Sequence, residues 1–598
     1  MISNTDIRYF FDTYYDNFMH SLAWEDHLLE PASREEWLAT LRACADDQQQ
    51  RCADNQILLE QYLYPLSSNP ALLSDEGYDL LLSFCRDFYY SNYTEPALLI
   101  RIIDILLPHY EDRSDTESLL FLYICAGFSY MELSRTGEPT SRDKTIYFYT
   151  KVLSYRDQIE FFESAASRDY IFIAYYNLIR VAPGLGILDI ETAYRLWEEL
   201  CQIRTMPKFC QYDTTNPRIP QLCDCAINDF RAYGAVLNVE RVIAPSAILS
   251  SLENMTQIYY SEILHEHGSI YECPVFTVFN YHYVQARNGT ITWEAAWQIL
   301  DDYYVHKMQT IGQVSSPDLL AFYTNLPLNL IDVLGHTHFK EEFKQATYRR
   351  YRNLITSYLM NQPASLNSYT LNNGVQLVAF HPLILGTFQN RMEKMNFIVD
   401  LVVTRHLTTF THSVMVSYLA EAIGKHILAA RPELLRIPSS YLTGNIYASP
   451  AEVLDYIVPA ALFHDIGKNG MIPIINTQHR KLNDYEFNII QTHPQKGSDY
   501  LSSDPDFLIY QPVALGHHRS YDGTRGYPLS FDNTASPYRD AIDLIHICDC
   551  LDAATDYLSR NYHRAKPFDV VLNELKAGRG TEYNPDMVDV ILSDRELY

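Results

Sequence analysis

Apolar residues recur every three or four positions through about the first 360 residues, which places them on one face of successive α-helices. Short clusters of Pro, Gly, Ser and Asp interrupt this pattern and separate one predicted helix from the next. The clearest pair is a helix from Tyr170 to Val181, the breaker Ala-Pro-Gly-Leu-Gly, and a helix from Glu191 to Leu200. Two antiparallel helices joined by a breaker are the repeating unit of an α-solenoid. The N-terminal part is therefore predicted to be a helical-repeat region.

A second helical series follows a break in this pattern. The periodicity loosens around Thr370-Leu-Asn-Asn-Gly-Val375, and apolar residues at helical spacing return near Met392 and continue to the end. The sequence thus predicts an all-α protein with an α-solenoid-like region at 1–375 and a second helical domain at 376–598. The first region weakly resembles tetratricopeptide repeats, without a strict period of about 34 residues. Its many tyrosines are interpreted as packing between helices.

Composition limits the partners and the compartment. Lys+Arg 46 against Asp+Glu 74 gives a formal net charge of −28, so the surface as a whole repels nucleic acid polymers and anionic membranes. A phosphorylated substrate must then be attracted by local cations or metal ions. The sequence shows neither a signal peptide nor an apolar stretch long enough to span a bilayer. The cysteines (Cys 11) lack zinc-ribbon spacing and are expected to be reduced, so a cytoplasmic protein is predicted.

Seven imidazole and carboxylate side chains in the last third of the chain are candidate metal ligands. They are His412, His464, Asp465, His493, His517, His518 and Asp549. Neutral nitrogen and anionic oxygen donors suit divalent manganese, iron, cobalt or zinc. Seven donors exceed what one such ion takes, so convergence would indicate two ions roughly 3.5–4 Å apart, bridged by an acid and a hydroxide. Such a centre cleaves phosphoesters.

Helical periodicity predicts that several of these side chains point inward. His412 shares a face with Val416, Leu419 and Ile423, and Asp549 lies on an apolar stripe with Ile545. A buried acid without a partner is costly, and metal coordination offsets that cost. A single inward His or Asp is usually a hydrogen-bonded core residue, but seven in one domain favour a metal centre.

Three further candidate ligands receive local predictions. A helix is expected to begin at Asn483 as N-cap, with Glu486 completing a capping box, and to close at His493-Pro494. His517 and His518 are expected on a helix, where adjacent side chains diverge by about 100°. One of them would then reach a metal ion, and the other would serve the second ion or a substrate phosphate.

The order of the motifs over about the last 210 residues resembles the HD-GYP class of HD-superfamily phosphohydrolases. The matching stretches are His412-Ser-Val, His464-Asp-Ile-Gly-Lys468, Ile472-Pro473, Leu482-x-x-x-Glu486, His493-Pro-x-x-Gly497, His517-His518, Asp522-Gly523, Gly526-Tyr527-Pro528 and Asp549-x-x-Asp552-Ala553.

This resemblance implies an all-helical domain that cleaves a cyclic dinucleotide, chiefly cyclic di-GMP, to a linear dinucleotide by metal-activated water. It makes the seven side chains above ligands of two divalent ions, iron or manganese first, with zinc, cobalt or nickel as options. Asp465 would bridge both ions and Lys468 would hold a phosphate oxygen. Arg560 and Arg564 would bind substrate, and Arg519 and Arg525 supply further guanidinium forks for the second phosphate and guanine edges.

Three departures from the family pattern affect this inference. Thr408 stands where members with three metal ions have a glutamate, which predicts a two-metal site. Arg519 replaces the glutamate that usually follows the two histidines. One residue is inserted in Lys-Asn-Gly-Met-Ile-Pro and another in Asp-Gly-Thr-Arg-Gly-Tyr-Pro. Because these changes fall in loops that face the substrate, they bear on its identity more than on the metal ions.

Two alternatives stay open. One is an HD phosphohydrolase for another cyclic dinucleotide, such as cyclic GMP-AMP, or for a mononucleotide. The other is a weakly active, metal-loaded HD-domain sensor that signals through a protein partner bound by the N-terminal helical region. That region contains no nucleotide-binding fingerprint. The sequence does not fix the oligomeric state, with a homodimer as one option.

Overall fold

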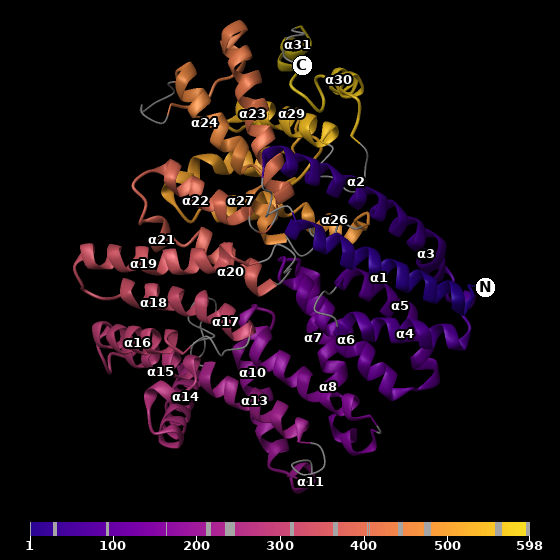
Figure 1. Cartoon of the computed structure of the whole chain (residues 1–598), viewed down its shortest axis with the longest axis vertical. Coiled ribbons are helices and arrows are strands. Elements are labelled where there is room, and N and C mark those ends of the chain that lie inside the picture. Colours follow the sequence, from indigo (N-terminus) through magenta and orange to yellow (C-terminus); the bar gives the residue numbers. More distant parts are fainter. Residues whose placement is uncertain are drawn as a thin grey trace. The chain divides into compact units, whose positions relative to one another are not determined.

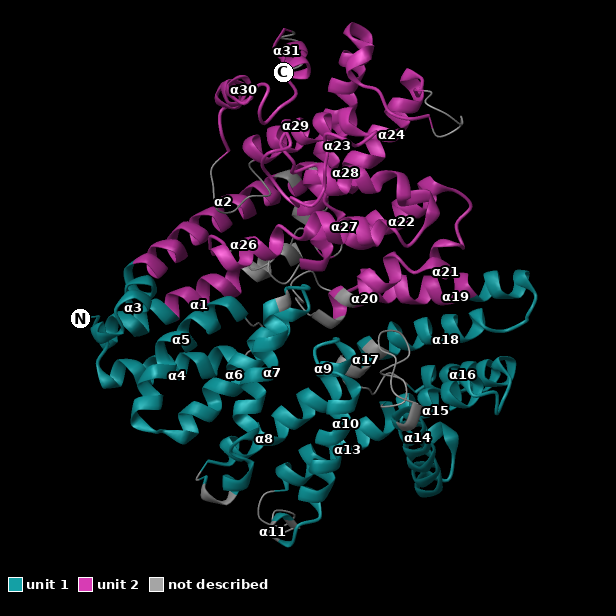
Figure 2. Cartoon of the chain, turned by 180° about the vertical axis from the view of Figure 1, so that it is seen from behind, with its two compact units in different colours: residues 1–11, 61–347 teal, residues 12–60, 348–598 magenta. Residues whose placement is uncertain are grey.

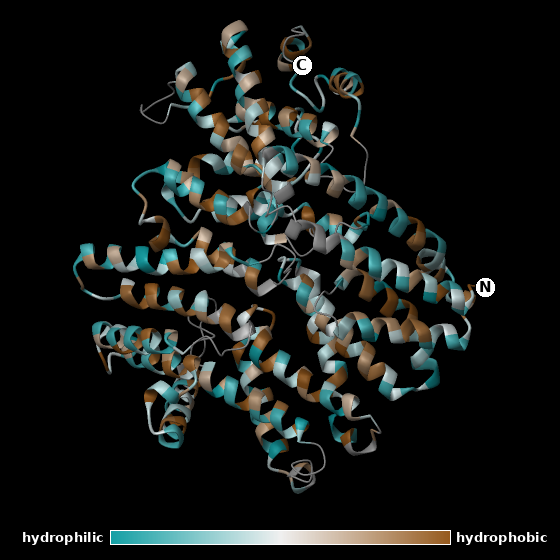
Figure 3. Ribbon diagram, in the orientation of Figure 1, coloured by the Kyte–Doolittle hydropathy of each residue, from teal (hydrophilic) through white to brown (hydrophobic). Residues whose placement is uncertain are grey.

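The computed structural model is helical throughout its described part (Figure 1). It describes the chain except for residues 1, 28–32, 91–94, 163, 211–216, 234–245, 311–315, 363–368, 404, 406, 440–446, 472–479, 557–564 and 594–598. Within these limits no β-strand occurs, and β-pairing is restricted to isolated bridges such as that between Arg519 and Gly526. Hydrophobic and hydrophilic residues alternate along most helices (Figure 3), which is the amphipathic pattern on which the prediction depended. The predicted all-α fold is confirmed.

The chain divides into two compact units (Figure 2). Unit 1 comprises residues 1–11 and 61–347, and unit 2 comprises residues 12–60 and 348–598. Most of α1 (Asn4–His27) and all of α2 (Arg34–Leu58) therefore belong to the unit formed by the C-terminal part of the chain. This association was not predicted from the sequence, because it depends on contacts between distant segments.

The remaining described α-helices of unit 1 follow one another along the chain. They are α3 (Tyr64–Ser68), α4 (Asp75–Tyr90), α5 (Pro96–Arg113), α6 (Thr116–Ser134), α7 (Pro139–Leu153), α8 (Ala165–Tyr176), α9 (Ala182–Gly184), α10 (Ile190–Arg204), α11 (Pro207–Cys210), α13 (Arg218–Tyr233), α14 (Ser246–His267), α15 (Val275–Arg287), α16 (Trp293–Met308), α17 (Ser316–Tyr323) and α18 (Asn325–Gly335). Helices α4 to α8 each pack against the next helix in the sequence, and so do α13 to α16. This nearest-neighbour packing is typical of an α-solenoid.

The predicted helix pair at residues 170–200 is present, with one difference in its connection. After α8 the chain continues through a π-helical turn, η4 (Asn177–Val181), into the short α9, so Ala182-Pro-Gly is still helical. The reversal comes at Gly186, whose φ of 67° lies in the left-handed region that glycine adopts without strain. The next helix, α10, packs against η4 and α8.

Unit 2 takes its C-terminal helices from residue 348 onward. After α19 (Glu341–Met360), which crosses the boundary at residue 347, they are α20 (Tyr369–Ala379), α21 (Pro382–Leu385), α22 (Arg391–Val403), α23 (Leu407–Ala430), α24 (Pro450–Phe463), α26 (Asp484–Ile490), α27 (His493–Leu501), α28 (Gln511–Gly516), α29 (Arg539–Thr555), α30 (Phe568–Ala577) and α31 (Pro585–Ser593). Two 3-10 segments, η8 (Ile466–Met471) and η9 (Pro505–Tyr510), connect helices near its centre. No helix of the described chain is both long and apolar enough to cross a membrane.

One prediction of local structure in this unit is right and one is wrong. The helical series expected near Met392 begins with α22 at Arg391. The break expected around Thr370–Val375 is instead helix α20. Leu371, Val375 and Val378 are fully buried at helical spacing, and this burial outweighs the weak helix propensity of the two asparagines and the glycine between them.

Glycines allow the closest packing at the centre of unit 2. An ideal Cβ on Gly467 would lie 1.9 Å from the carbonyl oxygen of His493, so η8 and the start of α27 touch through backbone alone. A Cβ on Gly424 in α23 would lie 2.5 Å from Ile457 Cδ1 in α24. Helix α23 also packs against α29. These contacts bring the segments that carry the predicted ligands into one small volume.

Candidate metal centre

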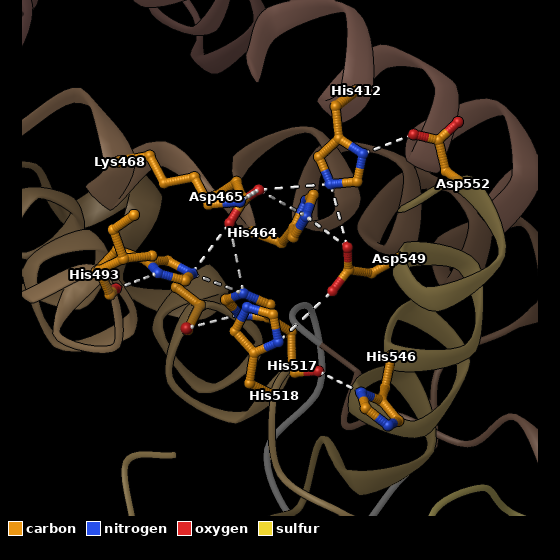
Figure 4. Close-up of polar contacts among 12 residues, drawn as sticks. His412, His464, Asp465, Lys468, His493, His517, His518, His546, Asp549 and Asp552 are labelled. Carbon is orange, nitrogen blue, oxygen red and sulfur yellow. Dashed lines mark hydrogen bonds and ion pairs between the residues drawn. The ribbon is translucent and has the colours of Figure 1, made fainter. Parts of the chain in front are cut away.

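All seven predicted ligands meet at one place in unit 2 (Figure 4). His412 comes from α23 and Asp549 from α29, while His464 and Asp465 end α24. His493 is the first residue of α27, and His517 and His518 follow α28. Six of the seven are buried, and the side chain of His518 is 21% exposed. The cluster therefore opens on the side of His518.

The ligand atoms fall into two groups, each with its atoms within 4.8 Å of one another. The first group is Asp465, His493, His517 and His518, and the second is His412, His464 and Asp549. The structure thus separates the seven donors into sets of a size that suits one ion each.

Asp465 faces both groups. Its Oδ1 lies 3.0 Å from His493 Nε2 and 3.6 Å from His517 Nε2. Its Oδ2 lies 3.4 Å from His412 Nε2 and 3.5 Å from His464 Nε2. A carboxylate with one oxygen toward each set has the geometry required of a bridging ligand.

Asp549 also reaches both sides of the cluster. Its Oδ1 lies 3.1 Å from His412 Nε2 and 3.9 Å from His464 Nε2, whereas its Oδ2 lies 3.6 Å from His518 Nδ1. His464 Nε2 is buried and forms no hydrogen bond with the described residues, although these two acids face it. A buried nitrogen without a hydrogen-bond partner, turned toward carboxylates, fits a cation as its missing partner.

Hydrogen bonds on the far side of four imidazole rings orient the metal-facing nitrogens. His464 Nδ1 donates to Ala461 O at 2.6 Å, His493 Nδ1 to Ile490 O at 2.7 Å, and His517 Nδ1 to Ala514 O at 2.9 Å. A proton held on Nδ1 leaves the Nε2 lone pair free, and in each ring Nε2 is the atom that faces the acids.

The fourth imidazole is oriented by a carboxylate. His412 Nδ1 lies 2.6 Å from Asp552 Oδ2, and both side chains are buried. This is the carboxylate–histidine arrangement that commonly supports metal ligands. Asp552 stood in the matching stretch Asp549-x-x-Asp552-Ala553, but no role was predicted for it from the sequence. The Asp-x-x-Asp spacing was the available signal, because it places both acids on one helix face.

Burial and neighbouring charge set the protonation of the cluster. Burial lowers the pKa of His464 and His517, and it lowers that of His493 to about 4, so these rings are neutral and able to bind a metal ion. Burial opposes the ionisation of Asp465, but Lys468 and the adjacent imidazoles hold its pKa well below its usual range. Burial likewise opposes a charge on His412, yet Asp465, Asp549 and Asp552 raise its pKa well above the ordinary value. Burial also opposes the ionisation of Asp549, but His412 and the neighbouring imidazoles hold its pKa well below its usual range, so Asp465 and Asp549 are ionised and attract positive charge.

Lys468 is the cation nearest to this set. Its Nζ lies 2.5 Å from Asp465 Oδ2, one turn of η8 further along the chain, and its side chain is 17% exposed. A flexible ammonium at the edge of the cluster is able to contact an anionic group of a ligand.

The predicted substrate arginines are placed differently from one another. Arg519 is 5% exposed, and its guanidinium donates to the carbonyl oxygens of Arg525 at 2.9 Å, Gly526 at 3.2 Å and Gly523. It therefore braces the loop that follows the paired histidines. Arg525 is exposed, with Glu582 at 3.4 Å. Arg560 and Arg564, like the Ile472-Pro473 stretch, lie outside the described residues.

The local predictions for the histidines need two corrections. The capping box at Asn483 and Glu486 is confirmed, but that helix, α26, ends at Ile490, and His493 begins α27 instead of closing α26. Pro494 explains this, because a proline in the first helical turn loses no hydrogen bond. His517 and His518 occupy a turn just after α28 and are not on a helix. Both rings turn toward the cluster, with centroids 4.1 Å apart.

His546 is a neighbour of the centre that the sequence did not single out. It is buried on α29, and its Nδ1 donates to the backbone carbonyl of His517 at 2.6 Å. Its Nε2 lies 3.3 Å from Glu582 Oε1. This chain of contacts fixes the backbone of the histidine turn.

Comparison with known proteins agrees with this geometry. Residues 409–560 match the model of the HD domain family. A cyclic di-GMP phosphodiesterase of Vibrio cholerae is 26% identical over 303 residues, covering 46% of this chain and 60% of the relative. The cyclic di-GMP phosphodiesterase response regulator RpfG of Xanthomonas campestris is 33% identical over 146 residues, covering 24% of this chain and 37% of the relative.

A third relative carries another substrate in its name. The 3'3'-cGAMP-specific phosphodiesterase 2 of Vibrio cholerae is 25% identical over 203 residues, covering 33% of this chain and 37% of the relative. The chain thus spans less than two thirds of each of these three relatives. The buried histidine and aspartate cluster and the family match lead to one conclusion: residues 409–560 of this chain form an HD domain.

Proposed function

We propose that this protein is a metal-dependent phosphodiesterase that hydrolyses a cyclic dinucleotide, cyclic di-GMP first, to a linear dinucleotide. The observation that carries the proposal is the position of Asp465 between two groups of buried histidines, with one carboxylate oxygen toward each. The names of the first two relatives supply the substrate.

The seven clustered side chains would hold two divalent ions, iron or manganese first, which supply Lewis acidity and lower the pKa of a water molecule. The protein orients the ligand side chains and buries the acids. Backbone carbonyls and Asp552 fix the imidazoles, and burial keeps bulk water away from Asp465 and Asp549. Lys468 would leave Asp465 to contact a phosphate oxygen and stabilise its developing charge.

The remaining parts of the proposal concern the rest of the chain. The catalytic domain is placed at 376–598 and a regulatory or partner-binding region at 1–375, in a cytoplasmic protein. Because residues 12–60 belong to unit 2, assays call for the full chain. Among the proposed substrate arginines, Arg525 is free to swing toward a ligand, whereas Arg519 is engaged with loop carbonyls.

The test is turnover and metal content of the full chain with Mn²⁺ or Fe²⁺. His464→Ala with Asp465→Ala should remove both bound metal and hydrolysis of cyclic di-GMP. The double variant removes His464 from one group and Asp465, which belongs to the other group and faces both. His338→Ala is the control, because it removes an exposed imidazole that is not among the seven clustered side chains. It should change neither the metal content nor the turnover. Undiminished turnover in the double variant would falsify the proposal.

A second candidate is a phosphodiesterase for 3'3'-cGAMP. It is favoured by the name of the third relative and by Arg519, which braces the loop where the family usually has a glutamate. A panel that contains both cyclic dinucleotides distinguishes the two by relative kcat/KM. Tight binding without turnover of either would favour the sensor alternative.

A further inference from the structure

Unit 1 contains a partly open cavity of about 450 Å³, lined by residues of helices α13, α14, α15, α16, α17 and α18 and of their ends. This volume is in the range of pockets that bind small molecules, roughly 300–1,000 Å³. It lies wholly within unit 1 and shares no residue with the metal centre. Nothing in the proposed phosphodiesterase activity requires it.

Aromatic rings contribute to its walls from four helices. Tyr233, Tyr259, Phe276 and Phe322 all line the cavity, and the rings of Tyr233 and Phe276 are 5.2 Å apart. The guanidinium of Arg180 lies 3.7 Å from the Tyr233 ring centroid, and that of Arg231 lies 4.7 Å from the Tyr259 ring centroid. Flat, apolar walls of this kind favour a planar ring in the ligand.

Hydrogen bonds from neighbouring helices hold the backbone of these walls. Asn280 Nδ2 donates to Ala232 O at 3.1 Å, and Thr256 Oγ1 donates to Arg231 O at 2.9 Å. Tyr303 donates to Cys273 O at 2.8 Å, directly before the lining residue Pro274, and Tyr304 donates to Phe322 O at 3.2 Å. Four separate helix contacts therefore fix the cavity in a formed state, which lowers the entropic cost of binding.

The charges that line the cavity are not equivalent. The carboxylate of Asp229 already accepts a hydrogen bond from Tyr176 at 3.2 Å and lies near Arg180. Lys307 also lines the cavity. Its ammonium lies 5.7 Å from the centroid of the Tyr303 ring and forms no ion pair with any carboxylate in the part of the chain that the structure describes. The one lining cation is thus available for a ligand, whereas the one lining acid is engaged.

The start of helix α15 adds partial positive charge to the cavity wall. The first turn of α15, Val275 to Thr277, lines the cavity, and its N-cap is Pro274, which provides no side-chain cap. The amides of a first helical turn point away from the helix and carry partial positive charge. Lys307 and these amides together favour an anionic group.

We propose that this cavity is a binding site for a small planar anion, an aromatic or heteroaromatic ring that carries a carboxylate, sulfonate or phosphate group. The ring lies between the aromatic walls, and the anionic group meets Lys307. Its size limit is about that of a mononucleotide, given the cavity volume of about 450 Å³.

The experiment uses two fluorescent probes with the full chain. 8-Anilinonaphthalene-1-sulfonate carries a planar ring system and an anion, and N-phenyl-1-naphthylamine has the same rings without the sulfonate. Lys307→Gln should weaken saturable binding of the sulfonate probe at least ten-fold and leave the neutral probe unchanged. Lys340→Gln, at an exposed lysine of the same unit, is the charge-matched control and should alter neither.

Phe276→Ala completes the design, because it removes a wall and not a charge. It should weaken both probes to a similar degree while thermal unfolding and hydrolysis by the HD domain stay as in the wild type. Equal sulfonate-probe affinity in the wild type and Lys307→Gln would overturn the proposal. So would loss of the neutral probe in Lys307→Gln, since the lysine would then act through packing.

Discussion

The polar groups of unit 1 bond in small local sets between neighbouring helices, whereas seven side chains of unit 2 converge on one another. In unit 1, Tyr175 donates to Glu199 at 2.8 Å, and Asn177 Nδ2 donates to Tyr149 at 2.9 Å. In unit 2, Asp465 alone faces four imidazole nitrogens within 3.6 Å. Both regions have the same amphipathic helices, so periodicity alone does not separate them.

The difference shows what distinguishes packing from chemistry. A donor paired with one acceptor needs nothing further and contributes about 1 kcal/mol to stability. Lone pairs and carboxylates that face one another repel, and they stay together only when a cation joins them. His493 Nε2 and His517 Nε2, for example, lie 3.1 Å apart while each ring donates its Nδ1 proton to a backbone carbonyl. The candidate metal centre is therefore the group of residues whose hydrogen-bonding capacity is directed toward one another.

The largest effect expected beyond loss of the ligands themselves concerns Lys468. Lys468→Ala should lower kcat about 100-fold, because a cation that stabilises phosphate charge in the transition state is lost. Metal occupancy, measured by elemental analysis of the purified variant, should stay near that of the wild type. A parallel loss of bound metal would instead assign Lys468 to the metal centre itself.

A smaller effect is expected for the residue that orients His412. Asp552→Asn keeps the shape of the side chain but weakens the contact with His412 Nδ1 at 2.6 Å. Metal affinity should fall about 10–100-fold, with activity restored by excess Mn²⁺ or Fe²⁺. Competition against a fluorescent chelator measures this change. An affinity equal to that of the wild type would show that His412 does not depend on Asp552.

The smallest effect belongs to the paired groups of unit 1. Tyr175→Phe removes one hydrogen bond, to Glu199, and should lower the free energy of unfolding by about 1 kcal/mol. Chemical denaturation monitored by circular dichroism gives that value. Metal content and hydrolysis should not change, and a change in either would contradict the separation between packing and chemistry drawn above.

Features that depend on interactions between residues close together in the sequence could be predicted from it. The all-α fold, the start of α22 and the capping box of α26 follow from periodicity and from side chains that satisfy nearby amides. The seven candidate ligands could also be identified from their residue types and, for His412 and Asp549, from the inward face of the helix. The structure brings all seven together.

The remainder depends on contacts that the sequence does not display. Helix α20 forms because Leu371 and Val375 are buried against other elements. His517 and His518 follow α28 in a turn, yet both rings point toward the cluster. His546 on α29 supports this turn, because its Nδ1 donates to the backbone carbonyl of His517. The grouping of residues 12–60 with unit 2 is likewise a matter of tertiary packing. The domain boundary near residue 375 stays a prediction.

Metal stoichiometry of the purified full chain tests the central claim most directly. Elemental analysis should find two divalent ions per chain in the wild type. Asp465→Asn should lose at least one of them, because its amide nitrogen cannot replace the second carboxylate oxygen as a ligand. Asp499→Asn, at an exposed acid on α27, should retain both ions. Two ions retained by Asp465→Asn, or none in the wild type after reconstitution with Mn²⁺ or Fe²⁺, would contradict the account.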